Sequence, residues 1–217
     1  MKFFLQVEHP LTEALVGVDL VEWQLRVAAG EALPLTQEEV LLRYESGGHA
    51  IEVRLCAEDP AQAYLPQAGR ILHWQPPRSV RCDHALVSGC VVSPFYDSML
   101  AKLIAHAPTR DDAIHQLADA LDRTVCLGLS TNRAFLARVL RHPAFAGEAV
   151  TTAFLGQHFA DNAARAGDSP SWLRALAAAA NATLAPSAPS AMWAGWTSSN
   201  RVETHSPLRV SERVEAR

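Results

Sequence analysis

Strand-type segments are grouped between two helical stretches of this chain, and this order constrains the fold more than any other feature. The helical pattern covers residues 1–43 and returns over residues 109–165, whereas residues 44–106 hold short apolar runs separated by Gly, Pro and Asp. Segregation of helices from strands is typical of α+β proteins. The sequence therefore predicts an α+β fold.

The clearest strand pattern lies in residues 49–56. Apolar side chains at 51, 53 and 55 alternate with Glu52, Arg54 and Cys56, so the two sets point to opposite faces of a sheet. Further strands are predicted at residues 69–74, 79–83, 86–92 and 99–107.

Three helices begin at residues suited to the N-cap position. Asp19 is followed three residues later by Glu22, which predicts a capping box, and Thr109 and Thr131 are the other predicted caps. The helix after Thr131 should stop before Pro143. The helix after Thr109 is predicted to present one apolar face, made of Ala113, Ile114, Leu117, Leu121 and Val125.

Composition argues against several classes of protein. The chain has 19 Lys and Arg against 23 Asp and Glu, so its net charge of −4 does not favour a nucleic-acid partner. No run of about 18 apolar residues is present, so no membrane span is predicted. The four cysteines lack metal-ligand spacing, so we expect no metal site. We expect the four cysteines to be buried or half-buried free thiols in a reducing compartment, which favours a cytoplasmic location.

Few polar residues stand out as candidates for chemistry. Glu8 lies just before a helix start, Glu52 and Arg54 share one strand face, and Lys102 lies within a later apolar strand. On residue type alone, structural roles are favoured. Glu8 would then face a helix N-terminus, and Arg54 would pair with Glu52 or Glu58. Lys102 and Asp97 are expected to be structural.

Several longer segments resemble one known family. Residues 5–13 read LQVEHPLTE and residues 48–60 read GHAIEVRLCAEDP, which resemble the LQVEHPVTE and GHAIExRxxAEDP signatures of biotin carboxylase. Segments 19–30, 95–103, 128–132 and 140–145 are similar to further motifs of that family. The chain is therefore identified as similar to the C-terminal region of the biotin carboxylase part of acyl-CoA carboxylase α subunits.

The resemblance implies a domain organisation. Residues 1–43 would be a remnant of an ATP-grasp domain, and residues 44–160 would be a biotin carboxylase C-terminal domain, with an antiparallel sheet and helices. Residues 161–217, rich in Ser, Pro and Ala, would be a partly disordered linker and the start of a further domain.

The resemblance also implies residue roles. Biotin carboxylases use MgATP and bicarbonate to carboxylate biotin held on a carrier domain. Glu8 matches the general base that acts on bicarbonate, and Gln6 and the N–H of Val7 match positions that hold bicarbonate. Arg54 matches the arginine that binds biotin and steadies the negative oxygen developing on its ureido ring.

One departure from the family affects activity. The family has roughly EMNTR before LQVEHP, and here Lys2 and Phe4 stand at the asparagine and arginine positions. A counterpart of the magnesium-binding glutamate and most of the ATP site are missing. We therefore expect an N-terminally truncated fragment that is inactive alone and binds neither ATP nor Mg²⁺.

The resemblance implies partners as well. These are a biotinyl carrier domain, a carboxyltransferase β subunit, and a second copy of the chain bound through residues 44–160. The acyl-CoA substrate is chosen by a different subunit. The alternative hypothesis is a non-catalytic dimerisation or interaction module derived from biotin carboxylase.

Overall fold

A computed structural model describes residues 8–147, 150–160 and 175–176. The chain divides into two compact units, residues 1–166 and 167–217. The second unit is described only at residues 175 and 176, so the predicted linker and domain start at 161–217 lie almost entirely outside the described residues.

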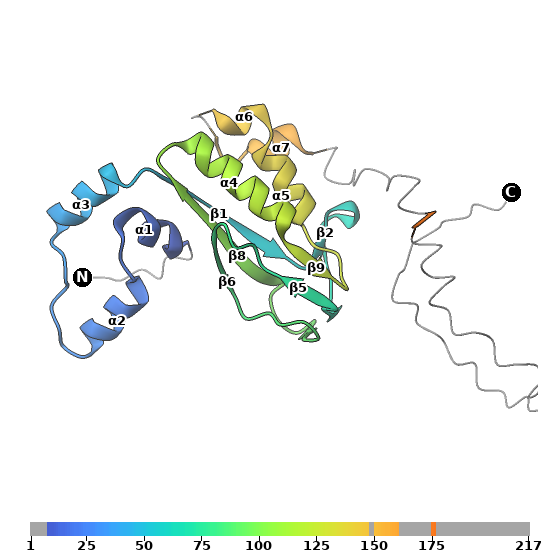
Figure 1. Cartoon of the computed structure of the whole chain (residues 1–217), viewed down its shortest axis with the longest axis horizontal. Coiled ribbons are helices and arrows are strands. Elements are labelled where there is room, and N and C mark those ends of the chain that lie inside the picture. Colours follow the sequence, from blue (N-terminus) through green and yellow to red (C-terminus); the bar gives the residue numbers. More distant parts are fainter. Residues whose placement is uncertain (1–7, 148–149, 161–174, 177–217) are drawn as a thin grey trace, which may run out of the picture. The chain divides into compact units, whose positions relative to one another are not determined.

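A three-stranded antiparallel sheet forms the centre of the first unit. Its strands are β1 (His49–Cys56), β8 (Met99–Ala107) and β6 (Arg81–His84), in the order β1-β8-β6. Helices α4 (Arg110–Arg123) and α5 (Arg133–Leu140) lie along this sheet (Figure 1). The α+β prediction and the strands predicted at 49–56 and 99–107 are confirmed.

Shorter strands surround the central sheet and differ from the prediction. The segment predicted as one strand at 69–74 is split between two strands, and only residues 91 and 92 of the predicted strand 86–92 are extended and paired. Val125 was predicted to lie on the helix, but it pairs with Gln75 in a strand. The short strand pairs are β2 (Glu58–Asp59) with β3 (Leu65–Pro66), β4 (Gly69–Arg70) with β7 (Val91–Val92), and β5 (His73–Gln75) with β9 (Val125–Leu127).

The core lies between the sheet and α4. Leu55 and Leu103 from neighbouring strands and Leu117 and Leu121 from α4 are completely buried. Each such side chain contributes roughly 1.5–3 kcal/mol by leaving water. A second cluster of Phe135, Phe154 and Phe159 joins α5 to the last described helices, α6 (Pro143–Ala146) and α7 (Phe154–His158).

Three helices precede the sheet: α1 (His9–Val16), α2 (Leu20–Ala28) and α3 (Gln37–Ser46). Asp19 caps α2 by accepting the N–H of Glu22 at 2.8 Å, as predicted. The predicted capping box is wrong, because the Glu22 carboxylate pairs with Arg26 one turn further along.

Two other caps also differ from the prediction. A complete capping box opens α3, where Thr36 and Glu39 bond each other's backbone N–H groups. The N-cap of α5 is Asn132 and not Thr131, and its side chain does not cap the helix.

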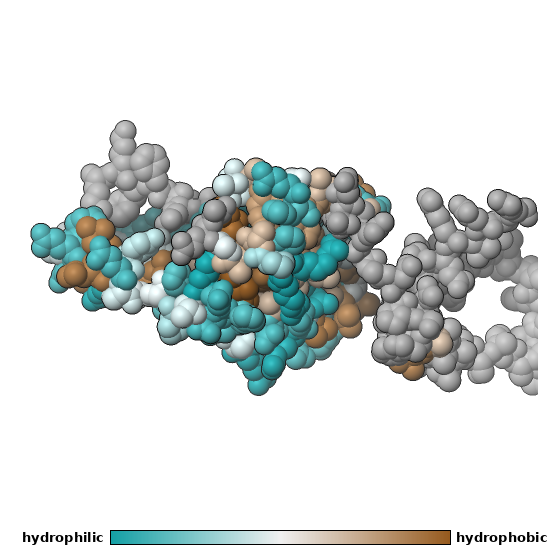
Figure 2. Space-filling view, turned by 90° about the horizontal axis from the view of Figure 1, so that it is seen from above, coloured by the Kyte–Doolittle hydropathy of each residue, from teal (hydrophilic) through white to brown (hydrophobic). Residues whose placement is uncertain are grey.

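Helices α2 and α3 bury none of their residues. Figure 2 shows hydrophobic surface at the end of the unit that these helices form. The exposed apolar side chains at this end are Val21, Leu25, Leu41, Leu42 and Tyr44.

No helix among the described residues combines the length and apolar character needed to cross a membrane.

Candidate functional site

The structure brings Glu8 and Arg54 together although 46 residues separate them. Nη2 of Arg54 donates a hydrogen bond to Oε1 of Glu8. Glu8 occupies the N-cap position of α1, but its side chain does not cap the helix, so the carboxylate is left to Arg54. The two side chains are 43% and 45% exposed, so solutes can reach the pair.

The structural alternatives for Arg54 are not observed. Its partner is neither Glu52 nor Glu58, and Glu58 instead accepts a hydrogen bond from Ser98 at 2.6 Å. Gln6 and Val7, the other predicted site residues, lie outside the described residues. The structure therefore describes two of the four predicted site residues, and these two are in contact.

Asn132 holds the backbone on either side of Leu55, directly after Arg54. Its Oδ1 accepts the N–H of Cys56 at 2.9 Å, and its Nδ2 donates to the carbonyl of Arg54 at 3.1 Å. Strand β1 is at the edge of its sheet, so these groups have no neighbouring strand there. Asn132 lies at the end of the family-like segment 128–132, but no role was predicted for it. An amide with both donor and acceptor capacity was the only available signal.

Replacing Asn132 with Ala is expected to lower the free energy of unfolding by about 1–3 kcal/mol. The N–H of Cys56 and the carbonyl of Arg54 would each lose their hydrogen bond to the Asn132 side chain. Urea unfolding followed by circular dichroism measures this loss. The exposed Ser130→Ala, two residues away, is the control and should change stability by less than about 0.5 kcal/mol. Equal stability of the two variants would show that Asn132 does not hold the strand.

A second charged pair lies on the same sheet face as Arg54. The Glu52 side chain is only 3% exposed, and its Oε1 lies 3.6 Å from Nζ of Lys102. Neither carboxylate oxygen of Glu52 has a hydrogen-bond partner among the described residues. Burial raises the pKa of Glu52, with Lys102 acting in the opposite direction and Glu8 adding to the rise. Glu52 is therefore a buried acid whose charge is compensated mainly by one lysine.

This raised pKa predicts a pH-dependent stability. A carboxyl group whose folded pKa lies above its unfolded value stabilises the fold most below the unfolded value, near 4.3, and this stabilisation is lost as the pH rises through the folded pKa. Glu52→Gln should match the native chain near pH 4 and become progressively more stable than it at higher pH. Urea unfolding of both chains at a series of pH values is the measurement, and parallel curves would contradict the prediction.

A third ionic group fixes α1 against the sheet. The buried Glu13 accepts the N–H of Leu20 at 2.8 Å and pairs with Nη1 of Arg81 at 2.7 Å. Arg81 also pairs with Asp83 at 2.8 Å. Hydrogen bonds to Asp83 and Glu13 hold the pKa of Arg81 above its usual range. These contacts tie α1, and with it Glu8, to β6.

A cavity of about 440 Å³ lies beside Arg54. Glu52, Arg54 and Cys56 of β1 form its polar side, and the rest is largely apolar. A mostly apolar cavity with a few polar groups is typical of small-molecule sites. Its apolar lining comes chiefly from Leu136, Val139, Leu140, Phe145, Phe154 and Leu155.

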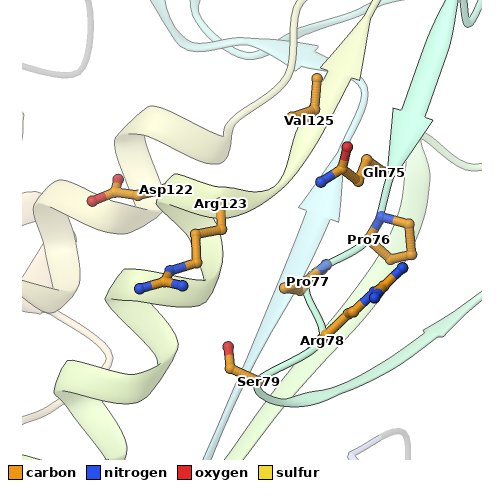
Figure 3. A pocket seen from close by; sticks show the side chains of 8 residues that line it. All are labelled: Gln75, Pro76, Pro77, Arg78, Ser79, Asp122, Arg123 and Val125. Atoms are coloured by element: carbon orange, nitrogen blue, oxygen red, sulfur yellow. The ribbon is translucent and has the colours of Figure 1, made fainter.

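Another cavity, of about 630 Å³, lies between residues 75–79 and the end of α4. Arg78 and Arg123 line it, but Figure 3 shows their guanidinium groups pointing away from each other. Asp122, also in the lining, pairs with Arg141 at 2.5 Å. The cavity therefore lacks the converging donors that would hold an anion.

The four cysteines are free and half-buried, as predicted. Burial raises the pKa of Cys56 and Cys126 and raises that of Cys82 to about 11, so these three thiols are protonated and poorly nucleophilic at neutral pH. The described residues contain no group of three or more His, Cys, Asp or Glu side chains that could hold a metal ion.

Comparison with known families decides the identity of the sheet-bearing region. Residues 52–157 match the family described as the biotin carboxylase C-terminal domain. This chain contains a biotin carboxylase C-terminal domain. Residues 1–36 match the ATP-binding domain of the carbamoyl-phosphate synthase L chain, a second family. The resemblance identified in the sequence is confirmed.

Relatives with the biotin carboxylase C-terminal domain are longer than this chain. The biotin carboxylase of Halalkalibacterium halodurans is 47% identical over 156 residues, which are 71% of this chain and 33% of that protein. The mitochondrial methylcrotonoyl-CoA carboxylase subunit alpha of Mus musculus is 45% identical over 160 residues, 72% of this chain and 22% of that protein. The chain spans a third or less of the length of these curated relatives.

Solved structures confirm the fold. The biotin carboxylase domain dimer of Hydrogenobacter thermophilus 2-oxoglutarate carboxylase, in complex with MgADP, ADP and bicarbonate, superposes with a TM-score of 0.68. The two sequences are 38% identical, and the match covers 73% of this chain and 34% of that one. The expected relation to the biotin carboxylase fold is therefore confirmed.

Proposed function

We propose that this chain supplies the bicarbonate- and biotin-facing part of a biotin carboxylase, which carboxylates carrier-bound biotin with ATP and bicarbonate. The observation that carries the proposal is the contact between Glu8 and Arg54. The two residues come from separate family signatures and meet at a solvent-accessible position beside a largely apolar cavity. We also propose the division into residues 1–43, 44–160 and 161–217.

The proposed chemistry follows from the two side chains. Glu8 acts as the general base that removes the proton of bicarbonate, and its partial exposure leaves room for that substrate. Arg54 donates to the ureido oxygen of biotin as negative charge develops on it, and a guanidinium stays charged throughout. Gln6 and the N–H of Val7 are proposed to hold bicarbonate.

The other substrates and partners belong to the same proposal. MgATP is a substrate of the reaction in this proposal. A biotinyl carrier domain would present biotin, and a carboxyltransferase β subunit would receive the carboxyl group. The free cysteines support a cytoplasmic location.

A chimera tests the proposed function. Residues 5–160 would replace the matching third of the Halalkalibacterium halodurans biotin carboxylase, so that the positions of Lys2 and Phe4 keep that protein's own residues. ADP release would be measured with and without biotin and bicarbonate. We expect biotin-dependent ADP release from the chimera and none from the 217-residue chain alone. A folded chimera that hydrolyses ATP at the same rate with and without biotin would overturn the proposal.

The second candidate is a dimerisation module without catalysis. The exposed apolar side chains of α2 and α3 favour it, because surfaces of this kind mark interaction sites. Light scattering after size-exclusion chromatography of the chain tests this candidate. A dimer together with an inactive chimera would support it, and a monomer would exclude it.

A further inference from the structure

We infer that the buried pair Glu52–Lys102 positions Arg54 toward Glu8. This inference rests on the proposed function, in which Arg54 must present its guanidinium beside the Glu8 carboxylate. Glu52 and Lys102 are positioning residues, and we assign them no contact with substrate.

The register of the sheet places these groups together. Arg54 on β1 is directly opposite Lys102 on β8, and Glu52 lies two residues from Arg54 on the same strand face. Directly opposite residues in an antiparallel sheet have Cβ atoms about 4.5–5.5 Å apart. Arg54 therefore has one carboxylate on its own strand, Glu52, and a second at the start of α1, Glu8.

These two carboxylates compete for one guanidinium. Glu52 is 3% exposed and has no hydrogen bond to its oxygens among the described residues, so its charge requires compensation by a nearby cation. Lys102 supplies this compensation at 3.6 Å. Arg54 can then turn outward to Glu8, which is the arrangement observed.

Asp83 is a second acidic neighbour of Lys102, but its carboxylate is paired with Arg81. Asp83 on β6 is directly opposite Lys102 in the register. Its carboxylate accepts two hydrogen bonds from Nε of Arg81 and pairs with Nη2 of that residue. Arg81 thus holds Asp83, while Lys102 lies within ion-pair distance of Glu52.

Nitrogen-15 spectroscopy of the arginine side chains in the 217-residue chain tests the inference. The Arg54 signal is assigned by its loss in Arg54→Gln, and the exchange rate of its guanidinium protons with water is then measured. Lys102→Met should slow this exchange by about two- to fivefold, because Arg54 then leaves the half-exposed pair with Glu8 for the buried carboxylate of Glu52. Arg26, whose pair with Glu22 is similarly exposed, is the matched control and should not change.

The double variant distinguishes positioning from simple structural support. Glu52→Gln combined with Lys102→Met removes the competing carboxylate, so the exchange rate of Arg54 should return to the native value. A rate that stays slow in the double variant, or a rate that is unchanged or faster in Lys102→Met, would overturn the inference. If Lys102→Met does not fold, Lys102→Gln replaces it in the same comparison.

The readout does not depend on activity. An inactive chimera together with the expected exchange rates would refute the proposed function while the coupling of Arg54 to Lys102 through Glu52 is retained. An active chimera without the coupling would refute the positioning role alone.

Discussion

Replacing Glu8 with Gln in the chimera is expected to lower the rate of biotin-dependent ADP release by about 10²- to 10⁴-fold, the usual contribution of a general base. Glutamine keeps the size and hydrogen-bonding capacity of the side chain but cannot accept the proton of bicarbonate. The loss should fall on kcat, because the amide can still occupy the same position. Steady-state kinetics with varied bicarbonate measure both constants.

Glu22→Gln is the matched control for this variant. Glu22 also forms an exposed ion pair, with Arg26, so its replacement removes a comparable interaction without touching the proposed site. Loss of either pair should cost no more than about 1 kcal/mol of stability. If Glu8→Gln and Glu22→Gln have the same kcat, Glu8 is not the base.

Gly128→Ala is expected to destabilise the chain by more than about 3 kcal/mol. Gly128 follows β9 with a φ of +117°, a conformation that residues with a side chain rarely adopt. A Cβ there would lie 2.2 Å from the carbonyl oxygen of Arg70 and 2.9 Å from the backbone nitrogen of Leu72. The backbone would have to move, which would disturb the hydrogen bond from Leu72 to Leu127.

The control for this variant separates backbone strain from the clash. Gly30 also has a positive φ, +89°, but a Cβ there would meet nothing within 4 Å. Gly30→Ala should therefore cost only about 1–3 kcal/mol, from backbone strain alone. Urea unfolding of the two variants measures the difference in the free energy of unfolding. Equal losses of stability would show that the close contact between Gly128 and the backbone of residues 70–72 does not add to the effect.

Local patterns predicted the elements whose periodicity is regular. Strict alternation at 49–56 and the long apolar run at 99–107 became the two longest strands, and the apolar face after Thr109 became α4. Period-based reasoning succeeds in such segments because each buries one consistent face. It failed at Val125, where the helix ends and β9 pairs with β5, because that pairing depends on a segment 50 residues earlier.

The α+β class, the family resemblance, and Glu8 and Arg54 as candidate site residues could be predicted before folding is considered, since they depend on local patterns and on contiguous motifs. The support of the site depends on contacts that exist only in the folded chain. Asn132 bonds to the backbone of Cys56 across 76 residues, Arg81 reaches Glu13 across 68, and Lys102 lies beside Glu52 through strand register. No periodicity links residues so far apart, because such contacts depend on how the strands pair and on how the helices pack against them.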